Sequence, residues 1–165
     1  MARLQTSSIP LTPPIHRVCE PLGPEWDEIA ATILAPCTSM GTAEAGQAAL
    51  RDLRQEDGAT LYALIDGGAL VAAYALRKNG LALEIAWLVV APDQRRRGFG
   101  RTCLHDALRR AGKRPLVAEA DDDSLPFYRG VGFKLVGKRR APNGSTRFRL
   151  SWHSPRPGAV EASRT

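Results

Sequence analysis

The sequence has few of the residues that build disulfide frameworks or metal sites. Its 165 residues include three scattered histidines and three widely spaced cysteines, Cys19, Cys37 and Cys103. No CxxC or CxxxH spacing occurs, so neither a disulfide framework nor a zinc site is predicted, and no metal is expected. Each cysteine is expected to be a small buried or half-buried residue.

Long apolar runs are absent as well. No run approaches the roughly 18 apolar residues of a membrane-spanning helix. The first residues, MARLQTSSIPLTPPI, lack the continuous apolar segment of a secretory signal. The sequence therefore predicts no membrane partner and a cytoplasmic location.

The chain does have positive charge and enough length for a core. Its formal net charge is +6, and 44% of its residues are hydrophobic. Such a charge is compatible with nucleic acid, with an anionic membrane surface or with a phosphorylated ligand. The positions of the charges must therefore decide between these classes of partner.

The pattern along the chain predicts one domain. We expect a flexible N-terminal segment over residues 1–14, a domain over 15–152 and a flexible tail over 153–165. Apolar periodicity and turn residues predict an alternating series of elements. Strands are expected over residues 15–21, 59–65, 69–77, 81–90, 114–120, 132–140 and 145–152, and helices over 23–34, 42–55, 98–111 and 124–129. The fold class is α+β, with a mixed, mostly antiparallel twisted sheet flanked by about four helices.

Helical spacing also predicts which side chains point inward. In the second helix, Thr42 is the expected N-cap and Leu50 and Leu53 are the expected core residues. Gly112 is expected to end the third helix. The inward residues of the first helix are Trp26, Ile29, Ala30, Ile33 and Leu34, and those of the third are Phe99, Cys103, Leu104, Ala107, Leu108 and Ala111.

One stretch, EIAWLVVAPDQRRRGFGRTCL from Glu84 to Leu104, combines a buried strand, three arginines and a Gly-x-Gly turn before a helix. The first N–H groups of a helix lack partners within it, and the helix dipole adds partial positive charge there. Gly98 and Gly100 leave space for a phosphate to approach the main chain. The stretch therefore predicts a diphosphate site.

Three other interpretations of the glycines and arginines are weaker. A dinucleotide fingerprint needs Gly or Ala where the chain has Cys103. The stretch GFKLVGKR resembles a P-loop, but Arg139 replaces the hydroxyl residue and the stretch lies inside a predicted strand. A solvated loop face is the simplest alternative for the arginines.

At these residues the chain resembles the GNAT superfamily of acyl-CoA-dependent N-acetyltransferases. RRRGFG matches the family's [QR]-x-x-G-x-[GA] motif, and LVVAP matches its usual lead-in strand. DDDSLPFYRGVGF resembles the second signature, in which Tyr128 precedes Gly132 and Phe133. The two signatures lie about 30 residues apart, as an intervening helix and strand require. The resemblance covers residues 60–152.

The resemblance implies that acetyl-CoA is the acyl donor and a primary amine the acceptor. It implies that the backbone of one strand pairs with the pantetheine arm and that the arginine loop holds the pyrophosphate. The residues implied are Leu88, Val89 and Val90 in the strand and Arg95, Arg96, Arg97, Gly98, Phe99, Gly100 and Arg101 in the loop. A main-chain N–H near Leu88 is the implied oxyanion donor.

The resemblance also implies that Tyr128 protonates the leaving sulfur, for which a phenol is chemically suited. The alternative is an aromatic residue packed beneath the sheet. Phe127 and Phe133 are expected to be core residues. Asp121 and Asp122 depart from the family, which commonly has an asparagine before this short helix.

Glu84 is the candidate base, because it interrupts an apolar strand and an unpaired buried carboxylate is costly. Its spacing from Gly98 also matches the glutamate of histone-type family members. A salt bridge at the rim of the site, an acceptor contact or a water relay are the alternatives.

The sequence identifies the acceptor less closely than the donor. It is implied to enter between residues 34–42 and 141–145, which carry no clear acidic cluster. A larger acyl-CoA, or CoA binding without catalysis, is the alternative within the family, and a homodimer is left open. A nucleic-acid-binding protein is disfavoured, because the basic final hairpin has few aromatics and no recognition helix.

Overall fold

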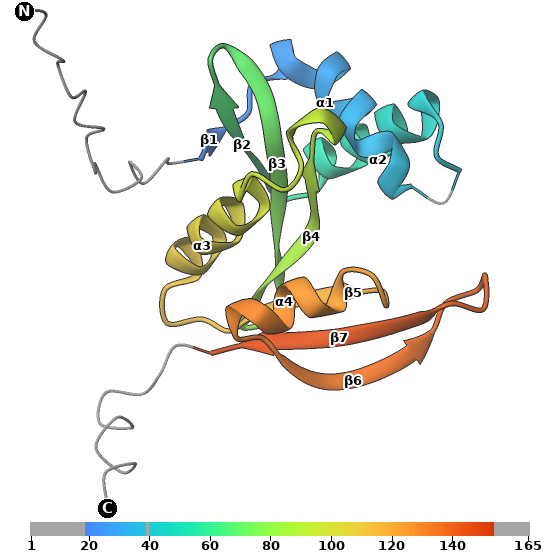
Figure 1. Cartoon of the computed structure of the whole chain (residues 1–165), viewed down its shortest axis with the longest axis vertical. Coiled ribbons are helices and arrows are strands. Elements are labelled where there is room, and N and C mark those ends of the chain that lie inside the picture. Colours follow the sequence, from blue (N-terminus) through green and yellow to red (C-terminus); the bar gives the residue numbers. More distant parts are fainter. Residues whose placement is uncertain (1–18, 39, 154–165) are drawn as a thin grey trace, which may run out of the picture.

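The computed structural model describes residues 19–38 and 40–153. These residues form a seven-stranded sheet in the order β1-β2-β3-β4-β5-β7-β6, with α-helices packed on both faces (Figure 1). Neighbouring strands are antiparallel, except that β4 and β5 are parallel. The strands are β1 (Glu20–Pro21), β2 (Thr60–Asp66), β3 (Ala69–Asn79), β4 (Ala82–Val90), β5 (Leu116–Ala120), β6 (Lys134–Arg140) and β7 (Thr146–Trp152). The helices are α1 (Asp27–Leu34), α2 (Ala43–Gln55), α3 (Phe99–Ala111) and α4 (Leu125–Val131).

The predicted α+β class, with a mostly antiparallel sheet flanked by four helices, is confirmed. The flexible segment 1–14 and nearly all of the tail 153–165 were predicted for residues that lie outside the described ones. Of the first predicted strand, Glu20–Pro21 is observed as β1, where it pairs with Tyr62 and Ala63 of β2.

The ends of α2 and α3 follow the predicted signals. Thr42 caps α2, because its hydroxyl accepts a hydrogen bond from the N–H of Ala45 at 3.2 Å. Gly112, at φ 60°, follows the last residue of α3. Leu50 and Leu53 are buried, as predicted.

The inward position predicted for Ile29 is wrong, since that side chain is 49% exposed. The predicted helix over residues 23–34 begins with a 3-10 turn, Pro24–Trp26, and the α-helix begins only at Asp27. A 3-10 turn has about three residues per turn, so it rotates the buried stripe relative to a continuous α-helix. The buried residues of α1 are therefore Ala30, Ala31 and Leu34.

Each face of the sheet has its own core. On one face, α1 and α2 bury Leu34, Leu50 and Leu53 against β2, β3 and β4. On the other face, α3 and α4 bury Leu104 and Tyr128 against the middle of the sheet. The central strands are packed between these two cores. This packing fixes the positions of the neighbouring edges of β4 and β5.

Strands β4 and β5 pair over only three residues and then separate. Leu83, Glu84 and Ile85 pair with residues 116–118 of β5. Directly after Ile85 the register between β4 and β3 shifts, so that Ala86 is an extra residue on β4. Such a bulge bends a strand and re-aims its side chains, and bulges are common beside active sites.

Candidate functional site

The second half of β4 has an open edge. Beyond the bulge at Ala86, residues 87–90 pair with β3, and no pairing of residues 86–90 with β5 occurs in the described chain. The N–H of Ala91 donates to the carbonyl of Val71 on β3 at 2.8 Å. Because main-chain groups alternate in direction along a strand, Leu88 and Val90 present theirs to the open edge. An extended amide-bearing ligand can pair with these groups.

The open edge leads to a pocket of about 470 Å³ at the N-terminus of α3. Gly98 occupies the N-cap position and makes no side-chain cap, and the first residues of the helix, Phe99, Gly100 and Arg101, line the pocket. The lining residues are Val90, Gln94, Arg95, Arg96, Gly98, Phe99, Gly100, Arg101 and Phe127. The helix dipole, the main-chain N–H groups of the first turn and the guanidinium groups are together suited to binding an anion.

The loop before α3 is shaped by two residues in the left-handed region, Arg96 at φ 62° and Gly98 at φ 83°. Arg96 is the one residue other than glycine with positive φ in the described part of the chain. This conformation is uncommon for a side-chain-bearing residue and clusters at binding loops. It turns the loop so that Arg95 and Arg96 both line the pocket.

Gly100 leaves space that a side chain would fill. A Cβ there would lie 3.4 Å from Val90 and 3.5 Å from Phe127, both of which line the pocket. Both distances are ordinary contacts, so the fold tolerates the Cβ while the pocket loses volume. At Gly98 a Cβ meets nothing within 4 Å, but the positive φ strains any other residue.

Three of the predicted donor-binding residues do not line this pocket. The Arg97 guanidinium donates to the Gln94 side chain at 2.7 Å and lies over the Phe99 ring at 5.7 Å. The Val89 side chain is buried in the core beneath α1 and α2. Leu88 packs against the opposite core, so its main chain is the part that the open edge offers.

Gln94 and Phe127 line the pocket although sequence reasoning did not assign them to it. Phe127 was predicted to be a core residue, and it is half-buried with one side on the core. An aromatic residue one position before Tyr128 was the available signal, but its direction depends on how α4 packs.

Tyr128 is buried in α4 between two aromatic rings. Its ring lies 5.3 Å from that of Phe127 and 5.4 Å from that of Phe133, both edge-to-face. Burial first, and then the nearby charge of Asp121 and the Cys37 thiol, raises the pKa of Tyr128 to about 12. The phenol therefore keeps its proton at neutral pH.

Cys37 was predicted to be buried or half-buried, and this is wrong, because its side chain is exposed. It ends the 3-10 turn Ala35–Cys37, which follows α1 and of which only Ala35 is buried. Partial loss of water around the thiol raises its pKa, and the positive charge of Arg95 opposes that rise. Cys37 thus interacts through charge both with Arg95 of the arginine loop and with Tyr128. Cys19 and Cys103 are fully buried, as predicted.

Glu84 is half-buried and both of its oxygens have partners. Oε1 accepts from the Arg77 guanidinium at 2.9 Å, and Oε2 accepts from the Asn79 amide at 3.1 Å. Each carboxylate oxygen retains a second acceptor position. The side chain lies one residue before the last pair between β4 and β5, on the strand that carries the open edge.

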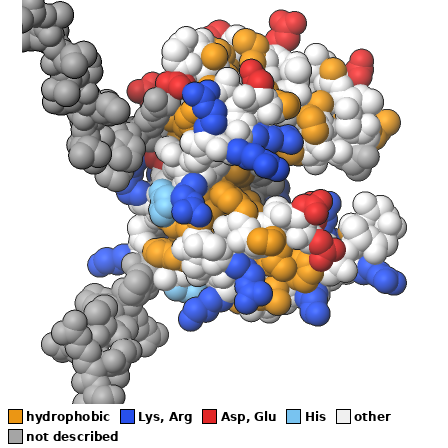
Figure 2. All heavy atoms as spheres, viewed as in Figure 1, with side chains coloured by type: hydrophobic (Ala, Val, Ile, Leu, Met, Phe, Trp, Pro, Cys, Tyr) orange, Lys and Arg blue, Asp and Glu red, His pale blue; other side chains and the backbone are white. Residues whose placement is uncertain are grey.

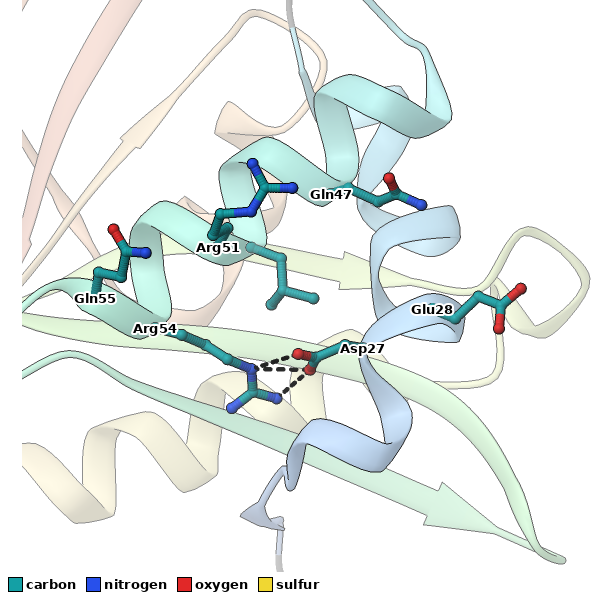
Figure 3. Close-up of a pocket in the computed structure, with 7 residues that line it drawn as sticks. Asp27, Glu28, Gln47, Arg51, Arg54 and Gln55 are labelled. Atoms are coloured by element: carbon teal, nitrogen blue, oxygen red, sulfur yellow. Dashed lines mark hydrogen bonds and ion pairs between the residues drawn. The ribbon is translucent and has the colours of Figure 1, made fainter.

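Another pocket, of about 480 Å³, lies between α1 and α2 (Figure 3). There Arg54 points across to Asp27, with which it forms an ion pair, and it also donates to the carbonyl of Leu22 at 3.1 Å. Arg54 thereby ties the two helices to β1. None of the residues predicted for the site lines this pocket.

Two further findings concern the described residues as a whole. No helix among them is long and apolar enough to cross a membrane. They contain no group of three or more His, Cys, Asp or Glu side chains arranged to hold a metal ion.

Comparison with known proteins identifies the architecture. Residues 37–153 match the family model described as Acetyltransferase (GNAT) domain. No curated protein sequence matches the chain. Among solved structures, an aminoglycoside 6'-N-acetyltransferase complexed with coenzyme A matches at a TM-score of 0.72 and 15% identity, covering 85% of this chain and 99% of that chain.

Two other solved structures are similar. The aminoglycoside 6'-N-acetyltransferase from Enterococcus faecium has a TM-score of 0.69 and 15% identity, covering 85% of this chain and 99% of its own. The ribosomal-protein-S18-alanine N-acetyltransferase from Escherichia coli has a TM-score of 0.65 and 17% identity, covering 86% and 96% respectively. At these identities the solved structures establish a shared fold.

Proposed function

Since the chain belongs to the GNAT acetyltransferase family, we propose that it transfers an acetyl group from acetyl-CoA to a primary amine by direct attack of the amine. One feature carries this proposal: the open edge of β4 runs into an uncapped helix N-terminus lined by arginines. This order suits a ligand with amides at one end and a diphosphate at the other. A cytoplasmic location is part of the proposal.

The donor contacts divide between main chain and side chains. The main-chain groups of Leu88 and Val90 pair with the pantetheine amides, and Val89 anchors this segment in the core. The N–H groups that follow Gly98, at Phe99, Gly100 and Arg101, face the diphosphate. Arg95, Arg96 and Arg101 neutralise its charge, while Arg97 holds the loop through Gln94.

Tyr128 acts as the acid. When the amine nitrogen bonds to the thioester carbonyl carbon, the carbon–sulfur bond breaks and the sulfur leaves as a thiolate. A phenol that stays protonated at neutral pH can give its proton to that thiolate. A main-chain N–H at the bulge, near Leu88, stabilises the charge on the carbonyl oxygen.

Glu84 acts as the base that removes the proton from the acceptor ammonium, directly or through one water. Its pairing with Arg77 and Asn79 fixes the direction of the carboxylate, and the free acceptor position on each oxygen can take the proton. The simple rim salt bridge that sequence reasoning left open is the alternative, and the pair with Arg77 is compatible with both.

Calorimetry of donor fragments tests the proposed donor site. Acetyl-CoA should bind and stabilise the folded chain, by about 2.7 kcal/mol at a concentration of 100 times its Kd. Dephospho-CoA should bind somewhat less well, and pantetheine far less, because it lacks the diphosphate. Equal stabilisation by pantetheine and acetyl-CoA would show that the arginine loop does not hold phosphate. Comparing acetyl-CoA with longer acyl-CoA donors distinguishes the main alternative.

A further inference from the structure

A small cavity lies where β4 and β5 are still paired, on the sheet face that carries α1 and α2. Its volume is about 60 Å³, space for on the order of four water-sized groups, which suits a short chain better than a sugar ring, and Glu119 and Arg149 at its rim are exposed. The lining residues are Asn79, Glu84, Val117, Ala118, Glu119, Val136, Arg149 and Leu150. The proposed base therefore shares a cavity with an arginine from the final hairpin.

The strand pairing explains why these side chains meet. Glu84 lies opposite Val117, and Glu119 lies opposite Arg149, in the registers of β4 with β5 and of β5 with β7. Residues that face each other across neighbouring strands project from the same face of a sheet. Helices α1 and α2 cover this face only over β2, β3 and β4, which leaves Glu119 and Arg149 exposed.

The carboxylates of this cavity are already paired. Arg77 donates to Glu84 at 2.9 Å, and Arg139 donates to Glu119 at 2.8 and 2.7 Å. Arg149 has no hydrogen bond or ion pair among the described side chains, although it acts on Glu119 through its charge. Arg77 pairs with Glu84 and Arg139 pairs with Glu119, so Arg149 is the charged group of this cavity that has no partner among the described side chains.

The neighbouring charged groups are themselves paired. Arg147, on the same face of β7, lies 3.8 Å from Asp121, and Arg77 also lies 3.8 Å from Glu56. In the view of Figure 2, Lys and Arg side chains are spread over the half of the molecule that holds β5, α4, β6 and β7, with Asp or Glu side chains among them. An acceptor with several positive charges, such as an aminoglycoside, would find no unpaired carboxylate among the residues that line this cavity.

We propose that the acceptor is an amine that also carries a carboxylate or phosphate, and that Arg149 binds this anionic group while the amine lies toward Glu84. The inference rests on the proposed acetyl transfer. A guanidinium offers two parallel donors to a carboxylate or phosphate, so it fixes the direction of the acceptor as well as attracting it. Val117 and Val136 supply apolar walls for the carbon chain between the two charged ends.

Matched acceptors test the inference. The probes are β-alanine, γ-aminobutyrate and ε-aminocaproate, their amides, and the diamines putrescine and hexamethylenediamine. All carry an amine on an alkyl chain and differ in the group at the far end. Calorimetry measures their binding to the protein saturated with CoA, and release of the CoA thiol from acetyl-CoA measures transfer.

We expect at least one amino acid to bind about tenfold more tightly than its own amide, and the matching diamine to bind more weakly still. Arg149→Gln should remove this preference and leave binding of the amides unchanged. Arg140→Gln is the matched control, because it removes the same charge from the same hairpin at a position that projects from the other face. The preference should persist in that variant.

The inference fails if amides or diamines bind as well as the carboxylates at every chain length, if no probe binds, or if Arg149→Gln keeps the preference. A matched phosphate, phosphoethanolamine, decides which anion is preferred. Failure of the proposed function is a different result: carboxylate probes bind through Arg149, but no amine causes thiol release.

Discussion

Tyr128 and Glu84 are both proposed to move protons, but their surroundings differ. Tyr128 is buried among Phe127 and Phe133, and burial raises its pKa to about 12. Glu84 is half-buried and bonded to Arg77 and Asn79. Tyr128 is thereby kept neutral, as an acid must be. Glu84 is held in place as a hydrogen-bond acceptor, as a base must be.

Tyr128→Phe should lower kcat by an amount on the order of 10²-fold, while the Kd of acetyl-CoA stays nearly unchanged. Because the pKa of Tyr128 is raised, its proton is lost only near pH 12, so the wild-type rate should show no decline between about pH 7 and about pH 10 from this group. Steady-state kinetics and calorimetry measure both quantities. Tyr62→Phe is the control, because it removes the same hydroxyl from β2. Full activity of Tyr128→Phe would reduce the tyrosine to a packing residue.

Glu84→Gln should change the pH profile of kcat/KM. In the wild-type protein kcat/KM should rise with pH through one ionisation and then level off. In the variant the rise should move toward the pKa of the free amine, about 10 for an alkylamine, and the deficit should shrink there.

Glu56→Gln is the matched control, since Glu56 also approaches Arg77, at 3.8 Å, and lies outside the cavity. A profile that Glu84→Gln leaves unmoved would assign Glu84 to the salt bridge with Arg77 alone. A water relay would then be the simpler base.

Sequence motifs predicted the candidate site residues, but they did not predict the directions of all the side chains. The Gly-x-Gly turn and the arginines could be read from the sequence because a helix N-terminus has a fixed chemistry. The direction of Val89 could not, because the extra residue at Ala86 depends on the register with β3. The exposure of Cys37 likewise depends on how a 3-10 turn leaves α1.

Helix α3 has an N-terminus that lines the proposed donor pocket and a middle that is held by buried polar contacts. Its N-terminus is uncapped, whereas its third turn carries Asp106, which is 4% exposed. Asp106 accepts from the Tyr74 hydroxyl and pairs with Arg109 and Arg110. Arg110 in turn donates to the carbonyl of Cys19 at 2.6 Å, which ties β1 to the helix. This network holds the helix that the donor pocket depends on.

Gly100→Val should abolish most donor binding while the chain stays folded. The added methyl groups would enter the pocket beside Val90 and Phe127, where a Cβ already makes ordinary contact. We expect acetyl-CoA to bind at least about tenfold less tightly, the factor that a loss of about 1.4 kcal/mol produces. Gly130→Ala is the control, because a Cβ there meets nothing and α4 should gain up to about 1 kcal/mol. Near-normal calorimetric affinity in a folded Gly100→Val protein would refute the pocket.

Asp106→Ala should lower the free energy of unfolding by about 3 kcal/mol, because it leaves the Tyr74 hydroxyl and the Arg110 guanidinium without their buried acceptor. Urea unfolding followed by circular dichroism measures this. Arg109→Ala removes an exposed partner of the same carboxylate and should cost less than about 1 kcal/mol. Equal losses in the two variants would show that burial of Asp106 is not what makes the network important.

The order of strands and helices was predictable because apolar residues recur about every two residues in strands and about every 3.6 residues in helices. α3 is the clearest case, since Phe99, Cys103, Leu104, Ala107 and Ala111 recur at helical spacing and all are buried. The separation of β4 from β5 was not predictable, because it depends on a short parallel pairing between segments about 30 residues apart. The same separation creates the open edge, so the site emerges only from the assembled sheet.

In the proposed function, donor and acceptor approach one opening in the sheet from opposite faces. The arginine pocket lies at the N-terminus of α3, and the cavity that holds Glu84 and Arg149 lies on the face that carries α1 and α2. Tyr128 of α4 is buried on the face that carries α3. The proposal gives each substrate its own entrance and has the reacting atoms meet where β4 leaves β5.

The most direct test of this account is mass spectrometry of a reaction that contains the purified protein, isotopically labelled acetyl-CoA and a panel of amines. Acetyl transfer predicts one labelled acetylated amine for each CoA thiol released, with both falling together in Tyr128→Phe. A folded protein that binds acetyl-CoA but yields no labelled amine above the enzyme-free blank, or that releases thiol without acetylating any amine, would contradict it.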